Sequence, residues 1–174
     1  AISRYKATHM GAPNFAYELC VRKVSSKRIA LIDLSSVQCM LNGAEPVRAT
    51  TLRSFATHFA ACGLRLEALA PGYGMAETCI LVSVDAVRPP TIIRVETSTL
   101  FVEGNVVVLD GFGEGGDDNT SELVGCGRVV PGAEIRPVSP ETKSSLSEGF
   151  VGELWLASPG LALGYYNNHE ATSE

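Results

Sequence analysis

The chain has 174 residues, of which 45% are hydrophobic and 19% are charged, and its formal net charge at pH 7 is −5. This composition is typical of a globular protein and excludes a disordered chain. The negative charge, with no basic run, argues against non-specific nucleic-acid binding, and no apolar stretch approaches the roughly 20 residues of a transmembrane segment.

The first two predicted elements are a helix and a short strand. Residues 13–24 (PNFAYELCVRKV) carry apolar side chains at helical spacing after an initial proline, which predicts an amphipathic helix. Residues 37–41 (VQCML) are largely apolar and run into the turn Asn42-Gly43, which predicts a short buried strand.

A second helix and a second strand follow in the same order. Residues 48–62 (RATTLRSFATHFAAC) again show helical spacing, and Gly63 is suited to end that helix. Residues 64–74 (LRLEALAPGYG) predict a strand that ends in a glycine turn, with a short helix from Ala76. Two helix-to-strand passages in succession predict an α/β layered sheet, which binds ligands at the carboxyl ends of its strands.

The later sequence has a different pattern. Residues 91–111 (TIIRVETSTLFVEGNVVVLDG) contain blocks of β-branched side chains without a helical period, which predicts strands. Residues 113–122 (GEGGDDNTSE) predict a flexible polar loop. Residues 134–158 predict a hairpin whose strands are IRPV and GELWLA.

The expected fold class is therefore α/β, with a layered mixed sheet and flanking helices at residues 1–87 and an antiparallel β-rich part at residues 88–174. The chain begins at AISRYKAT without a methionine and stops at NNHEATSE. We expect it to be an incomplete fragment of a longer polypeptide.

Several site classes find no support. GFGEGG (111–116) matches a dinucleotide-binding glycine pattern, but Asp117 and Asp118 follow where phosphate would need a helix N-terminus, so a polar loop is the better interpretation. The three histidines have no metal-binding spacing, and no nucleophile elbow or Walker loop occurs. The five cysteines never form a CxxC pair, which favours reduced thiols in a cytoplasmic protein.

Two glycine-containing segments remain, LNGAEPV (41–47) and PGYGMAET (71–78). Glu77 stands in an otherwise apolar run, so it is either solvated in a turn or held by a partner such as a cation. Tyr73 is either a packing aromatic residue or a flat surface for a planar base, and Glu45 is either a solvated turn residue or a ligand contact. A base on Tyr73, a phosphate near the Ala76 amide and a divalent cation on Glu77 would explain these features together.

Three motifs resemble those of the adenylate-forming superfamily, which contains acyl-CoA synthetases, peptide-synthetase adenylation domains and luciferases. YGMAE (73–77) resembles its Y-G-x-[TA]-E signature, and NGAEP (42–46) resembles its adenine-binding segment. GELWLASPGLALGYYNN (152–168) is similar to its G-E-[LI] block and follows the others in the same order.

Within that superfamily, the fatty acyl-AMP ligases are the most similar group. ISRYKATHMGAPNFAYELCVRK (2–23) and VGCGRVVPGAEIRPVSPET (124–142) resemble two of their blocks. Those enzymes carry an insertion between the Y-G-x-A-E motif and the second block, and it would correspond to part of residues 88–121. The likeness spans Ile2 to Thr172.

The resemblance implies a role for each matching position. Tyr73 would stack on adenine, and Glu77 would hold Mg²⁺ and act as the catalytic carboxylate. Ala76 stands where acyl-CoA synthetases usually have a threonine that contacts the α-phosphate. The other positions implied to bind the nucleotide are Gly43, Ala44, Glu45, Gly74 and Met75. The positions implied to lie near the acyl tunnel are Asn14, Phe15, Ala16 and Tyr17.

The resemblance also implies ATP and Mg²⁺ as cofactors, a fatty acid as substrate, and an acyl carrier protein or polyketide synthase as partner. The family's phosphate loop would precede Ala1, and its ribose-binding aspartate and catalytic lysine would follow Thr172, so this chain alone is expected to be inactive. Two alternatives stay open: a fatty acyl-CoA synthetase, against which Ala76 argues, and a non-catalytic module that binds lipid or a partner.

Overall fold

The computed structural model describes residues 1–109 and 119–173. The GFGEGG motif lies outside the described residues, as does most of the polar loop expected at 113–122. The helices and strands of the described ranges are, in chain order, α1 (Ile2–Tyr5), β1 (His9–Ala12), α2 (Asn14–Lys23), α3 (Ser26–Ile29), β2 (Cys39–Asn42), α4 (Ala49–Phe59), β3 (Leu69–Tyr73), β4 (Ser83–Val84), β5 (Ile92–Glu96), β6 (Thr120–Val124), β7 (Arg128–Val129), β8 (Glu134–Val138), β9 (Glu153–Ala157) and α5 (His169–Ser173).

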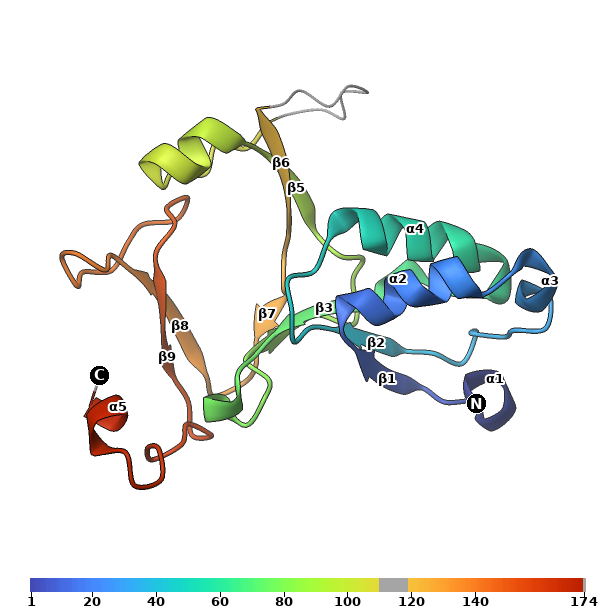
Figure 1. The fold of residues 1–174 in the computed structure, drawn as a ribbon, viewed down its shortest axis with the longest axis horizontal. Helices are drawn as coiled ribbons and strands as arrows, with labels where there is room; N and C mark the ends of the chain where they lie inside the picture. Colours follow the sequence, from blue (N-terminus) through green and yellow to red (C-terminus); the bar gives the residue numbers. More distant parts are fainter. Residues whose placement is uncertain (110–118, 174) are drawn as a thin grey trace.

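Five strands form one mixed sheet in the order β1-β2-β3-β4-β7 (Figure 1). The strands β1, β2 and β3 are parallel, whereas β4 and β7 are added in antiparallel pairing. The carboxyl ends of the parallel strands meet at one edge, where Asn42 lies between Ala12 and Pro71. This arrangement confirms the predicted fold class, a layered mixed sheet with flanking helices.

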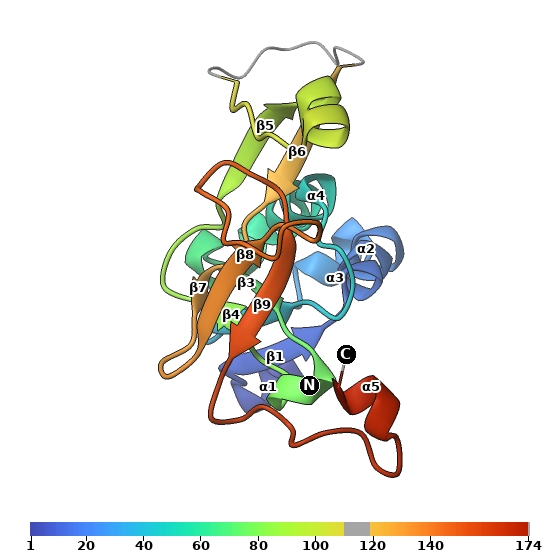
Figure 2. The same cartoon turned by 90° about the vertical axis from the view of Figure 1, so that its left-hand side faces the viewer.

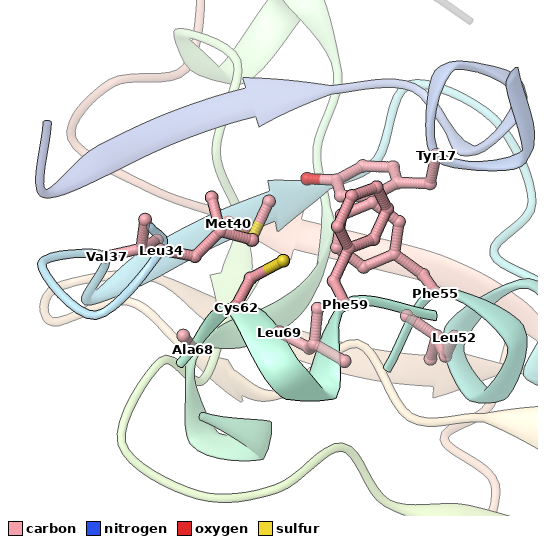
Figure 3. Close-up of a cluster of buried hydrophobic side chains, with 10 residues drawn as sticks. All are labelled: Tyr17, Leu34, Val37, Met40, Leu52, Phe55, Phe59, Cys62, Ala68 and Leu69. Atoms are coloured by element: carbon pink, nitrogen blue, oxygen red, sulfur yellow. The ribbon is translucent and has the colours of Figure 1, made fainter. Parts of the chain in front are cut away.

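Helices α2 and α4 pack side by side on one face of the sheet (Figure 1). Their apolar side chains form part of the main core between the helices and the sheet. Tyr17 of α2 meets Phe55 of α4 edge to face with ring centroids 5.0 Å apart, and Phe59 packs against Phe55 at 4.6 Å (Figure 3). Met40 of β2 joins them from the sheet. Burying a large apolar side chain stabilises a fold by about 1.5–3 kcal/mol, so this cluster holds the helices against the parallel strands.

After residue 88, β7 joins the mixed sheet, whereas β5–β6 and β8–β9 form two separate antiparallel hairpins. Figure 2 is viewed from the side of β8–β9, which stands in front of the five-stranded sheet. One hairpin is joined to α4 by an ion pair, in which both guanidinium ends of Arg53 donate to the Glu122 carboxylate at 2.7 and 2.6 Å. Within the described ranges, no helix is long and apolar enough to cross a membrane.

The predicted helices of the first half are confirmed with small shifts in their ends. The strand predicted from residue 64 is confirmed only from Leu69, because Leu66–Ala68 form a 3₁₀ turn instead. The first strand begins at Cys39 rather than at residue 37, and Gly63 ends the second helical segment in the left-handed conformation, with φ 78°. The turn from Ala76 is one turn of 3₁₀ helix. The hairpin predicted at 134–158 is also confirmed.

Two expectations about local structure were wrong, and one strand was not expected. Residues 99–103 were expected to be strand but form a π-helical turn, because the Thr99 hydroxyl donates to the Glu96 carbonyl and Gly104 ends the turn at φ 63°. Residues 120–122 were expected to lie in a loop but begin β6, where Glu122 faces the opposite charge of Arg94 across the hairpin. Strand β1 was not predicted, because its four residues contain a glycine and form a strand only by pairing with β2.

Candidate nucleotide site

A cavity of about 480 Å³ lies at the carboxyl ends of the parallel strands. Its volume falls within the roughly 300–1,000 Å³ that small-molecule sites usually have. It gathers every predicted nucleotide-binding position except Glu45, namely Gly43, Ala44, Tyr73, Gly74, Met75 and Ala76. Two segments that are 30 residues apart in sequence therefore form the two sides of one hollow, at the edge where an α/β sheet binds ligands.

Close backbone packing shapes this cavity at its glycines. A Cβ atom on Gly74 would lie 1.5 Å from the carbonyl oxygen of Ile80, and one on Gly43 would lie 2.8 Å from the carbonyl oxygen of Gly72. The loop returns tightly because Cys79 and Ile80 both adopt left-handed backbone angles, with φ 54° and 83°. Side chains at the two glycines would force these backbone segments apart, so the glycines set the width of the cavity.

Glu77 follows directly after the cavity residue Ala76, in the 3₁₀ turn. Its Oε1 atom accepts a hydrogen bond of 2.5 Å from the hydroxyl of Tyr165, and its carbonyl oxygen accepts one of 2.7 Å from the Ala162 N–H. The Tyr165 hydrogen bond lowers the pKa of the Glu77 carboxyl and raises the pKa of the tyrosine. The carboxylate in the apolar run is thus half-buried and has a protein partner.

The donor set around Glu77 fits a magnesium–nucleotide complex better than a metal bound by protein alone. Within residues 1–109 and 119–173, no three His, Cys, Asp or Glu side chains come together as a metal site. Magnesium usually keeps several waters and binds one or two carboxylates together with substrate phosphates. A single carboxylate beside a nucleotide-sized cavity meets that requirement.

Glu45 lies at the N-terminus of α2 and outside the cavity lining. Its Oε1 atom accepts a hydrogen bond of 2.7 Å from the N–H of Phe15. The first N–H groups of a helix have no partner within the helix. A carboxylate near them also interacts favourably with the positive end of the helix dipole. Glu45 therefore links the glycine turn of one candidate site segment to the helix that carries the predicted acyl-tunnel residues.

Asn14 is buried, with 3% of its surface exposed, at the start of α2. Its Nδ2 donates to Glu18 at 3.2 Å and to Thr51 at 3.1 Å, while its Oδ1 accepts from the Arg48 N–H at 3.2 Å and from Asn42 at 3.4 Å. Those bonds tie α2 to α4 and to the end of β2. Asn14 thus positions the elements around the cavity.

The other predicted tunnel residues divide into two groups. Ala16 and Tyr17 line a second cavity of about 400 Å³, whose walls are almost entirely apolar, whereas Phe15 is 58% exposed and does not line it. The Tyr17 hydroxyl donates to the Leu41 carbonyl at 2.8 Å, and burial raises the pKa of this phenol. Ala12, at the end of β1, lines both the apolar cavity and the candidate nucleotide site.

Sequence reasoning assigned no role to several residues that the structure brings to the site. Tyr165 is the clearest, since it contacts Glu77 from 88 positions further along the chain. The signal was available in the GYY end of the third superfamily motif, although the pattern does not say which tyrosine turns inward. Gly72 and Pro13 also line the cavity, and both precede residues that were named.

The family model described as "AMP-binding enzyme" matches residues 1–166. The chain therefore belongs to the AMP-binding enzyme family.

Its relatives include medium-chain-fatty-acid–[acyl-carrier-protein] ligases. JamA of Moorena producens is 35% identical over 99% of this chain, and TtuA of Teredinibacter turnerae is 31% identical over 97%. The chain spans 29% and 26% of the lengths of these two proteins. Among solved structures, a fatty acyl-adenylate ligase from L. pneumophila in complex with acyl adenylate and pyrophosphate matches with a TM-score of 0.88 and 34% identity, covering 98% of this chain and 29% of that one.

Proposed function

We propose that the polypeptide containing this chain activates a fatty acid with ATP. A carboxylate oxygen of the fatty acid bonds to the α-phosphorus, the bond from that phosphorus to the bridging oxygen breaks, and pyrophosphate leaves with the electron pair. The sulfur of a phosphopantetheine thiol on an acyl carrier protein then bonds to the acyl carbon and loses its proton, the bond from that carbon to the AMP oxygen breaks, and AMP leaves. The names of the two ligase relatives support an acyl carrier protein as the acceptor. The observation that carries the proposal is the cavity at the strand ends, which gathers six matching positions from two distant motifs.

We assign the nucleotide to this cavity. Tyr73 stacks on the adenine, with Gly43 and Ala44 along the opposite segment and Gly74 and Met75 closing the pocket. In this proposal Glu45 does not contact the nucleotide directly. It holds the N-terminus of α2 beside the glycine turn.

The phosphates lie beside Ala76 and Glu77 in this proposal. Glu77 would hold a Mg²⁺ ion through its carboxylate, whose pKa is lowered by the hydrogen bond from Tyr165. The bound ion would supply positive charge that offsets the charge developing on the phosphate oxygens. Ala76 leaves contact with the α-phosphate to the backbone.

We place the acyl chain near the apolar cavity lined by Ala16 and Tyr17. Its walls suit a hydrocarbon, and Ala12 lines both this cavity and the nucleotide cavity. We place the fatty acid carboxylate near Ala12, where it would join the α-phosphate. Phe15 and Asn14 begin the helix that carries these residues, and Asn14 fixes that helix through its buried hydrogen bonds.

The division near residue 88 remains our proposed boundary, and part of residues 88–121 our proposed family insertion, which includes β5 and the π-helical turn. We also propose the cytoplasm as the location. All five cysteines are free thiols, which supports a reducing compartment.

The test uses the full-length polypeptide with ATP, Mg²⁺ and a series of medium- and long-chain fatty acids, with and without CoA. Mass spectrometry resolves the products for the wild type and for Glu77→Gln. We expect acyl-AMP that persists when CoA is added and that falls sharply in the variant. Acyl-CoA as the main product would assign the polypeptide to the acyl-CoA synthetases. A folded polypeptide that forms no adenylate would leave a non-catalytic binding module.

A further inference from the structure

The segment from Ser158 to Tyr166 docks on the turn that carries Glu77. Besides the Tyr165 hydrogen bond, the Ala162 N–H donates to the Glu77 carbonyl at 2.7 Å, and the Cys79 thiol donates to the Gly160 carbonyl at 3.3 Å. Contacts at Glu77 and at Cys79 therefore hold this turn from a part of the chain more than 80 residues away.

Tyr165 is itself fixed in place. Its backbone N–H donates to the Thr172 hydroxyl at 2.9 Å, and its carbonyl accepts from the Asn168 N–H at 3.1 Å. The preceding Gly164 has no room for a side chain, because a Cβ there would lie 2.4 Å from a methyl carbon of Thr172. Tyr165 is 51% exposed, and the neighbouring Tyr166 is 95% exposed.

A glutamate side chain has three rotatable bonds, so an unheld carboxylate in a turn samples many orientations and loses that freedom when it binds a metal. We propose that Tyr165 is a positioning residue, whose hydroxyl holds Oε1 of Glu77 so that the carboxylate is oriented for the cation of a magnesium–nucleotide complex. This inference rests on the proposed function. The inference adds to that function a residue from the β-rich part, Tyr165, which orients the metal-binding carboxylate of Glu77.

Partners that orient a metal ligand typically change metal affinity by about 10- to 100-fold when they are removed. In the full-length polypeptide, Tyr165→Phe removes only the hydroxyl and keeps the ring. Titration calorimetry with ATP, in Mg²⁺ and in EDTA, then separates the metal-dependent part of nucleotide binding from the rest. We expect Tyr165→Phe to bind ATP like the wild type in EDTA, and to need about 10- to 100-fold more Mg²⁺ to reach half-saturation.

Tyr166→Phe is the matched control, since it removes a hydroxyl one residue away from an exposed ring, and it should behave like the wild type in both titrations. Glu77→Gln should lose the Mg²⁺ dependence, and adding Tyr165→Phe to it should cause no further loss, because the hydroxyl acts through the carboxylate.

Coincident Mg²⁺ titrations of the wild type and Tyr165→Phe would overturn the inference, as would additive losses in the double variant. Weaker ATP binding by Tyr165→Phe in EDTA, with an unchanged Mg²⁺ requirement, would also overturn it and would assign Tyr165 a purely structural role. A folded wild type that binds no ATP in either condition would instead remove the proposed function.

Discussion

The two parts of the chain differ in how they bury their apolar side chains. In the part before residue 88, two helices cover a parallel sheet, and Tyr17, Phe55 and Phe59 are each less than 5% exposed. In the described residues after 88, the buried hydrophobic side chains are Val95 and Val138, while Phe101 is 76% exposed. An isolated two-stranded hairpin has only marginal stability, so the β-rich part depends on contacts beyond its own strands.

This difference separates two ways of contributing to one site. The α/β part supplies the cavity, where the backbone of Ile80 packs so closely against Gly74 that no side chain fits at that glycine. The β-rich part supplies the Tyr165 side chain and two backbone contacts, from Ala162 and Gly160, all to the turn that carries Glu77. Perturbations of the first part should therefore disturb the cavity itself, whereas perturbations of the second should act mainly on the turn at Glu77.

The largest effect is expected from Phe55→Ala. Removing this ring opens a void between α2 and α4, and such substitutions cost about 3–5 kcal/mol. Native-state hydrogen exchange of the full-length polypeptide would measure the loss as faster exchange of the α2 and α4 amides. Phe101→Ala removes the same kind of ring from an exposed position. It should change the free energy of unfolding, as measured by hydrogen exchange, by less than about 0.5 kcal/mol. Similar losses in both variants would show that the two parts are not packed differently.

A smaller loss of stability, with a complete loss of the cavity, is expected from Gly74→Ala. The added methyl group overlaps the Ile80 carbonyl, and overpacking of this kind costs about 1–3 kcal/mol. Calorimetry with ATP and Mg²⁺ should detect no nucleotide binding. Gly125→Ala is the control in the other part, because its Cβ would meet Thr91 at an ordinary 3.5 Å. Wild-type nucleotide affinity in Gly74→Ala would contradict our assignment of the cavity.

The smallest effect is expected from Arg53→Leu, which removes the ion pair between the two parts. An exposed pair contributes about 0.2–1 kcal/mol, visible as faster hydrogen exchange in β6. The Arg53 hydrogen bonds lower the pKa of the Glu122 carboxyl. The contribution of these hydrogen bonds to the stability of the fold is therefore fully present at pH values above the ordinary pKa of glutamate. It is lost as the pH falls through the lowered pKa of Glu122.

The matched control is Arg136→Leu, because its partner Glu134 lies two residues away in the same strand. It should leave β6 exchange unchanged at every pH. A pH-independent effect of Arg53→Leu would mean that Arg53 does not lower the pKa of the Glu122 carboxyl.

Sequence reasoning recovered the parts of the fold that local pattern determines. The helical spacing in residues 13–24 and 48–62 predicted both covering helices, and glycines after strands predicted the cavity positions. It missed features that depend on a distant partner. Strand β1 needs β2, and the strand at Glu122 needs Arg94 opposite and Arg53 on α4. The hydrogen bond from Tyr165 to Glu77 belongs to the same class, because the two residues are 88 positions apart and no periodic pattern in the local sequence indicates the contact.

The pairing of β4 with β7 has a consequence for how this fold tolerates change. Val84 and Arg128 lie opposite each other in neighbouring strands, so the 43 residues between them leave the sheet and return to almost the same point. The entropy of closing such a loop grows only with the logarithm of its length, by about 0.6 kcal/mol for each doubling. The excursion that contains β5 and β6 can therefore lengthen, shorten or be replaced over generations while the sheet beneath it keeps its register.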